Sequence, residues 1–327
     1  MARNPYHSGP PSDHFDGARF FCPGHATDKT RAEMRRWRRE RAGPPWPAAP
    51  PAFRDRPPAR VAGPALRVSF IGHASFLIQT HGVNLLVDPV FSDRASPVAF
   101  AGPKRVTPPG VAFDDLPEID AILITHNHYD HMDAASLRRL ARDRPCPVIA
   151  PLGNDAILRR IDRRIAAQTL DWGERVGIGG VTIHLEPALH WSQRTLFDRR
   201  MALWGSFVVE TPAGRLWALG DTGFGDGSLF TRTGEKHGGF RLALIPIGAY
   251  APRWFMGPQH MDPHEAARAL LLCGAREALA FHWGTFRLTD EPYDEPVELL
   301  VQALAVEGVD PGRFHVKRPG ETLEIAF

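Results

Sequence analysis

The sequence predicts an α/β fold in which sheets and helices are stacked as a layered sandwich. Short apolar runs rich in β-branched residues recur along the chain and predict strands in two groups. Segments with helical periodicity lie between and beside them. With 327 residues, 43% of them hydrophobic, the chain buries roughly 75% of its unfolded surface, so it needs no disulfide or structural metal to fold. A metal bound here would therefore serve chemistry.

The first 64 residues predict a leader that lies as an extended strap over a main domain of residues 65–327. Eight prolines fall between Pro44 and Pro64, which excludes a regular helix or a central strand there. Within the leader, residues 28–41 predict a short helix whose arginines surround Met34 and Trp37. Such a helix is typical of a solvated element with one aromatic anchor, or of a helix on an anionic membrane surface. Both interpretations stay open.

The main domain is predicted to open as an antiparallel sheet. Residues 66–72, 75–80 and 83–88 predict strands, with His81 and Gly82 as a hairpin turn. Residues 119–125 predict a short buried strand that leads through a polar loop into a helix at 133–142.

The rest of the domain continues with alternating strands and helices. Strands are predicted at 148–150, 181–186, 206–210, 216–219, 242–247 and 278–281, and helices at 155–161, 263–273 and 296–306. The helix at 263 is the best marked, because Asp262 can cap it, Pro263 suits its first turn and Glu265 can close a capping box.

Composition excludes several classes of protein. Lys and Arg number 39 against 37 Asp and Glu, and the mixed charges argue against a nucleic-acid binder. The cysteines Cys22, Cys146 and Cys273 are too far apart for a thiolate zinc site and indicate a reducing compartment. The first residues lack a signal-peptide pattern, and no apolar run reaches the roughly 20 residues that span a bilayer. We therefore expect a soluble, cytoplasmic protein, at most peripheral on the inner face of the membrane.

The strongest functional signal follows the strand predicted at 119–125. His126, His128, Asp130 and His131 form an H-x-H-x-D-H pattern, which packing alone hardly explains. If the segment is extended, alternate residues share a face, so the first three would point to one position and His131 to a neighbouring one. Imidazole and carboxylate groups suit zinc and its first-row neighbours, including iron and manganese. The pattern predicts a metal centre.

Further ligands are predicted elsewhere, because four such residues cannot complete two metal spheres. His190, Asp221 and His282 each follow a short apolar strand, where a sheet delivers side chains to its rim. A carboxylate has two oxygens, so Asp221 could serve two cations. We expect these residues to converge on the histidine loop.

These motifs resemble those of the metallo-β-lactamase superfamily. Over about residues 66–320 the chain further resembles the branch of N-acylphosphatidylethanolamine-hydrolysing phospholipase D, through the strings DPVFSDRASPVAFAGPKR, ITHNHYDHMD, HWSQRTLFDRRMALWGSF, GDTGF, IPIGAYAPRWFMGPQHMDPHEA and HWGTFRLTDEPYDEP. The resemblance implies a four-layer αββα sandwich with two divalent metal ions, zinc being favoured. It implies that His126, His128 and His190 hold the first ion, that Asp130, His131 and His282 hold the second, and that Asp221 bridges them.

The resemblance also implies an activity: hydrolysis of N-acylphosphatidylethanolamine, or a related phospholipid, to phosphatidic acid and an N-acylethanolamine. Redox members of the superfamily are expected to carry Glu where this chain has His128, so hydrolysis is favoured. A metal pair would supply hydroxide at neutral pH. The catalytic residues would be Asp130, Asp221 and His260, and the substrate contacts Gln259, His260 and Tyr250.

Other residues near these motifs have two interpretations each. Asp88 is either a carboxylate that orients a ligand imidazole or a turn former before Pro89, and His73 either approaches the metal rim or is structural. The aromatic run at 254–256 is either core or the lining of an acyl groove.

The alternative enzyme is a lactonase or other ester hydrolase with the same metal centre and a soluble substrate. A nuclease is disfavoured because no basic stripe is present, and a non-catalytic binding module because every expected ligand is there. The expected partner is a phospholipid or other small molecule, with peripheral membrane contact and no nucleic acid.

Overall fold

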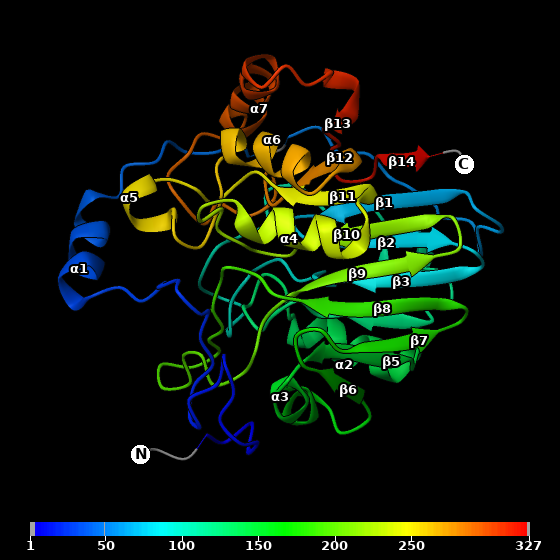
Figure 1. Ribbon diagram of the computed structural model, residues 1–327, viewed down its shortest axis with the longest axis horizontal. Coiled ribbons are helices and arrows are strands. Elements are labelled where there is room, and N and C mark those ends of the chain that lie inside the picture. The colour runs from blue at the N-terminus through cyan, green and yellow to red at the C-terminus, as the bar shows by residue number, and fades with distance from the viewer. Residues whose placement is uncertain (1–3, 49, 326–327) are drawn as a thin grey trace.

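The computed structural model describes residues 4–48 and 50–325, and within them two seven-stranded sheets face each other (Figure 1). The first sheet has the order β14-β1-β2-β3-β4-β5-β6. Its strands are β1 Leu66–Gly72, β2 Ser75–Thr80, β3 Val83–Val87, β4 Ala121–Leu123, β5 Pro147–Pro151, β6 Ala166–Leu170 and β14 Thr322–Ile325. The second sheet has the order β13-β12-β11-β10-β9-β8-β7. Its strands are β7 Arg175–Ile178, β8 Val181–Glu186, β9 Ser206–Thr211, β10 Gly214–Ala218, β11 Phe240–Pro246, β12 Ala275–Phe281 and β13 Phe314–His315.

Most of the helices cover the outer faces of the sheets, whereas those at residues 31–40 and 253–256 lie beyond the ends of the strands. The helices are α1 Arg31–Glu40, α2 Ala134–Asp143, α3 Asn154–Ile161, α4 Ser228–His237, α5 Arg253–Met256, α6 Pro263–Leu272 and α7 Glu295–Val306. One apolar cluster joins the inner faces of the two sheets, a second packs α2 and α3 on the first sheet, and a third packs α4, α6 and α7 on the second. The predicted four-layer αββα sandwich is confirmed.

Local sequence explains the best predicted elements. The β2–β3 hairpin turns through His81 and Gly82, both with positive φ angles of 49° and 76°. At α6, the Asp262 carboxylate accepts from the backbone N–H of Glu265, whose own carboxylate accepts from the N–H of Asp262. Both orphan donors of the first turn are thereby satisfied.

Some predicted boundaries are wrong. The strand predicted at 119–125 is limited to the three residues of β4, because the flanking residues leave the sheet ladder to enter loops. The helix predicted at 28–41 is shortened to α1, which Thr30 caps. The strands β6 and β7 and the helix α4 were not predicted, since their sequences mix apolar with polar, Gly and Thr residues and lack a clear period.

The leader is built into the core as well as lying over it. Phe15 and Phe20 are buried in the cluster between the two sheets, and the Trp46 indole N–H donates to the Glu291 carbonyl at 3.0 Å. Farther along, Asp55 forms a buried ion pair with Arg67 of β1 at 2.6 Å. The division of the chain at residue 64 stays a prediction. Within the described ranges, no helix is both long and apolar enough to cross a membrane.

Candidate metal centre

The sheet topology brings the predicted ligands to one edge. The strands β8, β10, β11 and β12 run in the same direction, so their carboxyl ends lie together. His190 follows β8, Asp221 follows β10 and His282 follows β12 directly. From the first sheet, β3 leads to Asp88 and its parallel neighbour β4 leads to the loop that begins at His126.

Three imidazoles meet at one position. His128 Nδ1 lies 2.9 Å from His126 Nε2 and 3.2 Å from His190 Nε2. Tetrahedral zinc with Zn–N bonds of about 2.0–2.1 Å holds its ligand nitrogens about 3.4 Å apart. The three nitrogens therefore have nearly the spacing that one shared cation requires.

A second group lies beside the first. His282 Nε2 is 3.5 Å from Asp130 Oδ2, and His131 Nε2 is 3.7 Å from the same oxygen. Asp221 lies between the two groups. Its Oδ1 is 3.1 Å from His282 Nε2, and its Oδ2 is 3.3 Å from His131 Nε2 and 3.7 Å from His190 Nε2. We call the seven residues of both groups the His/Asp cluster: His126, His128, Asp130, His131, His190, Asp221 and His282.

The expectation that Asp130 shares a face with His126 and His128 is wrong. The loop is a turn at this point, because the backbone N–H groups of His131 and Met132 donate to the His128 carbonyl at 3.2 and 2.8 Å. The period-two argument holds only for extended backbone. Asp130 consequently joins His131, in the division of ligands that the family resemblance implied.

Unpaired polar atoms show that the cluster suits metal ions. The buried atoms His131 Nε2, Asp221 Oδ1 and His282 Nε2 have no hydrogen-bond partner within the described chain. Buried polar groups without partners are rare and costly in folded proteins. Three of them on potential ligand side chains, among groups of mutually close donor atoms, fit bound cations.

The ionisation of the cluster also suits cations. Burial lowers the pKa of His128 to about 4 and that of His190 to about 3, so both are neutral near pH 7. Burial alone would raise the pKa of Asp221, but the neighbouring imidazoles, His131 first, outweigh it and hold the pKa well below the ordinary value. Neutral imidazoles and ionised carboxylates are the forms that bind divalent cations. At His131 and His282 burial would lower the pKa, but the carboxylates, Asp221 first, outweigh it and raise both, that of His282 to about 9. A cation bound at these two residues would therefore displace protons.

Two buried side chains hold cluster residues in place. Asp88 accepts hydrogen bonds from His131 Nδ1 at 2.7 Å and from the Thr125 hydroxyl and N–H at 2.6 and 2.8 Å. Of its two interpretations, the geometry favours the one that orients an imidazole. His73 Nε2 lies 2.9 Å from Asp130 Oδ2, and the His73 carbonyl accepts from the His282 N–H at 3.0 Å.

The cluster opens into a cavity of about 520 Å³, which we call the cluster cavity. His128, Asp130 and Asp221 line its inner end together with Gln259 and His260. His260 Nδ1 lies 3.9 Å from Asp221 Oδ2 and is buried without a hydrogen-bond partner in the described structure. Burial lowers the pKa of His260 to about 3, so its ring is neutral at pH 7. The Gln259 side chain accepts from the Trp191 indole at 3.1 Å.

Tyr250 does not lie where it was predicted. Its hydroxyl donates to Glu295 at 2.6 Å, and its side chain is absent from the lining of the cluster cavity. The GAYAPR segment turns the ring toward α7, so the geometry gives no support to the predicted substrate contact. From the aromatic run that follows, Phe255 and Met256 line the cavity, whereas Trp254 does not.

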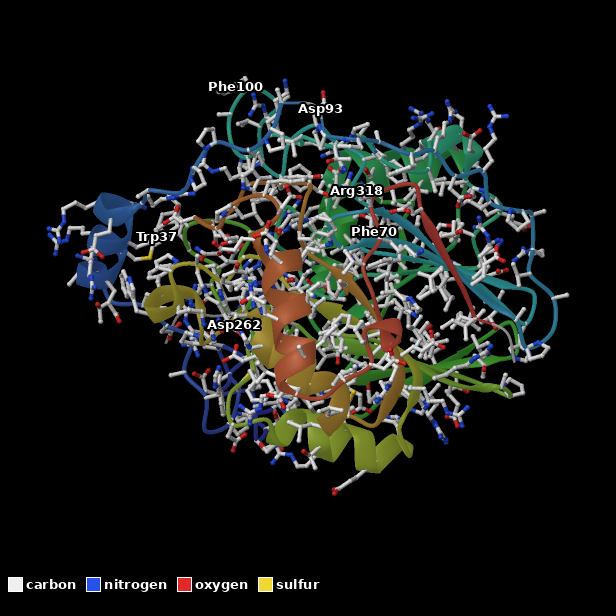
Figure 2. The ribbon with its side chains drawn as sticks, turned by 90° about the horizontal axis from the view of Figure 1, so that it is seen from above. Trp37, Phe70, Asp93, Phe100, Asp262 and Arg318 are labelled. Carbon is white, nitrogen blue, oxygen red and sulfur yellow. The ribbon has the colours of Figure 1, made fainter. Side chains whose placement is uncertain are left out.

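The sequence did not indicate that the leader closes this cavity. Lys29, Met34 and Trp37 form part of its wall, and Figure 2 shows Trp37 between α1 and the body of the protein. The Trp37 ring stacks on Phe255 with centroids 4.9 Å apart and planes within 4°. Met34 and Trp37 were the signal that could have found this wall, because they are the large apolar residues of an otherwise charged helix.

Comparison with known proteins identifies the family. Residues 83–283 match the model of the beta-lactamase superfamily domain. N-acyl-phosphatidylethanolamine-hydrolyzing phospholipase D 1 from Caenorhabditis elegans is 40% identical over 73% of this chain and 70% of the relative. The mitochondrial N-acyl-phosphatidylethanolamine-hydrolyzing phospholipase D from Saccharomyces cerevisiae is 34% identical over 78% of this chain and 55% of the relative.

A solved structure agrees on the fold. Igni18, a metallo hydrolase from Ignicoccus hospitalis, superposes with a TM-score of 0.59 at 20% identity, over 80% of this chain and 99% of that one. The family predicted from the motifs is confirmed: the chain belongs to the metallo-β-lactamase superfamily and, by its identity over most of its length, to the branch of N-acylphosphatidylethanolamine-hydrolysing phospholipase D.

Proposed function

We propose that this protein, a metal-dependent hydrolase of the superfamily, is a binuclear zinc-dependent phosphodiesterase of the phospholipase D type. Its substrate would be N-acylphosphatidylethanolamine or a related phospholipid, and its products phosphatidic acid and an N-acylethanolamine. The observation that carries the proposal is the composition of the cluster cavity. His128, Asp130 and Asp221 of the His/Asp cluster line it, and the large apolar residues of its wall are Met34, Trp37, Trp191, Phe255, Met256 and Leu288.

Such a cavity matches an amphipathic substrate. A phosphodiester has to reach the metal ligands, while acyl chains need apolar surface over several carbon atoms. Lys29 and Arg199 also line the cavity, and their positive charges suit the anionic phosphate and the anionic product. A soluble lactone would gain nothing from the long apolar wall. The relatives named above support the same choice of substrate.

The proposed chemistry assigns a task to each polar group. Two divalent cations, held by His126, His128 and His190 and by Asp130, His131 and His282, with Asp221 shared, would lower the pKa of water to about 7 and neutralise phosphate charge. His260 is neutral and its Nδ1 is free of other protein partners. It would donate a hydrogen bond to a phosphate oxygen as negative charge develops there. Gln259, fixed by Trp191, would contact the substrate beside it.

The test combines elemental analysis with a lipid-product assay. The purified protein is expected to contain two equivalents of zinc, and to release N-acylethanolamine and phosphatidic acid in mixed micelles, as measured by mass spectrometry. Chelation should abolish the release and zinc should restore it. A zinc-loaded preparation that hydrolyses a soluble lactone but yields no lipid product would refute the proposal. On this proposal the protein works in the cytoplasm, peripheral on the inner face of the membrane.

A further inference from the structure

Helix α1 and the residue that follows it carry a concentration of positive charge, whereas the rest of the chain has no excess of it. Residues 31–41 hold six arginines and two glutamates, a net +4, whereas the whole chain has a net charge of +2. The remainder of the chain is therefore slightly negative. No residue of α1 is buried, and none of the six arginines at 31–41 lines the cavity. Arg36 and Arg41 contact the body of the protein, which leaves Arg31, Arg35, Arg38 and Arg39 as the exposed arginines without such a contact. Within the described part of the chain, Arg31, Arg35 and Arg38 form no ion pair.

Contacts made by the opposite face of α1 determine the direction in which these arginines point. Trp37 stacks on Phe255, as described above, and the Arg36 guanidinium lies 4.2 Å from the ring centroid of Trp254. Just beyond the helix, Arg41 Nε lies 3.3 Å from an Asp290 carboxylate oxygen. The aromatic face is thus turned to the body and the cluster cavity. In Figure 1, α1 lies at the left edge beside α5, beyond the ends of the strands.

Exposed apolar side chains lie on a loop that is tied to the start of this helix. Leu196 and Phe197 are adjacent in the chain, and they are 87% and 82% exposed. Their loop joins β8 to β9, and its residues Trp191, Gln193 and Arg199 line the cluster cavity. Arg199 and Arg200 of the same loop each form an ion pair at 2.8 Å with Asp28, shortly before α1. The loop and the helix therefore border the same cavity.

We propose that this rim surface, made of Arg31, Arg35, Arg38 and Arg39 with Leu196 and Phe197, docks on a bilayer that contains anionic phospholipid. Arginine guanidinium groups pair with lipid phosphates, and each basic residue near an anionic membrane strengthens binding severalfold. Exposed apolar residues beside a basic helix insert at the boundary between headgroups and acyl chains.

The positive charge of the rim surface favours an anionic bilayer over other binding partners. A second copy of the same surface would bring two arginine clusters together, and like charges repel. A soluble anionic protein would pair with the arginines, but its binding would not require two neighbouring apolar side chains at an outer loop. The inference rests on the proposed function, since a bilayer is where a lipid substrate resides. Docking here would present the mouth of the cluster cavity to that bilayer.

The test is co-sedimentation of the zinc-loaded protein with vesicles that contain no N-acylated lipid, so binding is measured without turnover. We expect binding to vesicles of phosphatidylcholine mixed with phosphatidylglycerol, weakened by salt, and little binding to phosphatidylcholine alone. The variant R35E/R38E/R39E should bind the mixed vesicles about 100-fold more weakly. The variant L196S/F197S should bind them at least about tenfold more weakly, because it loses the inserting side chains.

A matched control separates position from net charge. Arg163, Arg175 and Arg276 are exposed and lie outside the rim surface. The variant R163E/R175E/R276E makes the same change in net charge and should bind within about twofold of the parent, since charges away from the contact are screened. Circular dichroism checks that each variant is folded.

Several results would overturn the inference. One is a parent protein that binds no vesicles, or that binds both vesicle types equally. Another is an equal loss of vesicle binding in the rim and control triple variants. The last is a stable dimer, detected by sedimentation analysis, in which Phe197 is buried. Hydrolysis in detergent micelles distinguishes this failure from that of the proposed function. If the parent protein releases lipid products in micelles but does not bind vesicles, only the proposed docking surface is refuted. If it binds vesicles but releases no product, the proposed substrate is refuted.

Discussion

Replacing Asp88 with Asn tests whether a buried carboxylate outside the ligand set controls the second metal position. Asp88 accepts three hydrogen bonds, from His131 Nδ1 and from the hydroxyl and N–H of Thr125. An Asn amide of the same shape can accept through its single oxygen only, and its NH₂ would face a donor. A hydrogen bond between charged groups contributes about 1.5–3 kcal/mol, which corresponds to about 10–150-fold in an equilibrium constant.

We therefore expect D88N to bind the second zinc ion about 10–100-fold more weakly, while the first ion stays bound. The assay is zinc content by elemental analysis after dialysis against buffers of fixed free zinc, together with kcat for lipid hydrolysis. The loss of kcat should be recovered at high zinc. A variant that retains two zinc ions at the parent's affinity would refute the reasoning.

The substitution D55N is the matched control for this experiment. Asp55 is also a buried carboxylate, but its partners are Arg67 and Ser69 on strand β1, next to the edge strand β14. Its loss should lower the free energy of unfolding, because Arg67 loses its ion pair, and should leave zinc affinity unchanged. If D55N lowered zinc affinity as much as D88N does, general destabilisation would explain both.

Three further substitutions test separate parts of the structure. His260→Ala should lower kcat about 10²–10³-fold with unchanged zinc content, as expected for the loss of one transition-state donor; unchanged turnover would make His260 a structural residue. Trp37→Ala removes the stack on Phe255 and should lower kcat/KM about tenfold for long-chain but not short-chain substrates, and equal losses would contradict the cavity wall. Glu186→Gln should lower the free energy of unfolding at pH 7 by about 2–3 kcal/mol, measured with denaturant. Burial raises the pKa of Glu186, but His237 and Lys236 outweigh it and hold the pKa below its ordinary 4.5. The stabilisation is therefore present above pH 4.5 and lost as the pH falls through the folded pKa, so the parent and the variant should converge in acid; a difference that persisted there would contradict the assignment.

The convergence of the candidate ligands could be predicted, because their positions in the sequence reflect their positions in the fold. His190, Asp221 and His282 each follow a buried strand, and strands that run in the same direction end at the same edge. The grouping of the ligands could not be derived in this way. It depends on the turn at 128–132, whose hydrogen bonds to the His128 carbonyl are made inside a loop without periodicity. For Asp130, the local pattern predicted His126 and His128 as neighbours, whereas the structure places it beside His131 and His282.

The cavity wall was harder to predict than the cluster, for a different physical reason. Trp37 lines the cavity through one stacked ring on Phe255, a contact between residues more than 200 positions apart. Periodicity within α1 shows only that Trp37 and Met34 share a face, and gives no indication of what that face meets. The burial of Phe15 and Phe20 between the sheets is equally non-local, and a proline-rich, turn-rich leader has no pattern that separates core from surface.

The cluster lies at the junction of the two sheets, and this has a consequence for how the halves of the fold depend on each other. His126, His128, Asp130 and His131 follow a strand of the first sheet, whereas the other three ligands follow strands of the second. Any cation bound by either group therefore joins the sheets at this edge, because each group takes ligands from both. Buried polar atoms without hydrogen-bond partners in the described chain lie at the same edge, and a bound cation would satisfy them. Metal binding then stabilises the native packing of the sheets by linkage. The large apolar cluster farther along the interface packs the inner faces of the same two sheets, so apolar packing and cation binding would act on one interface.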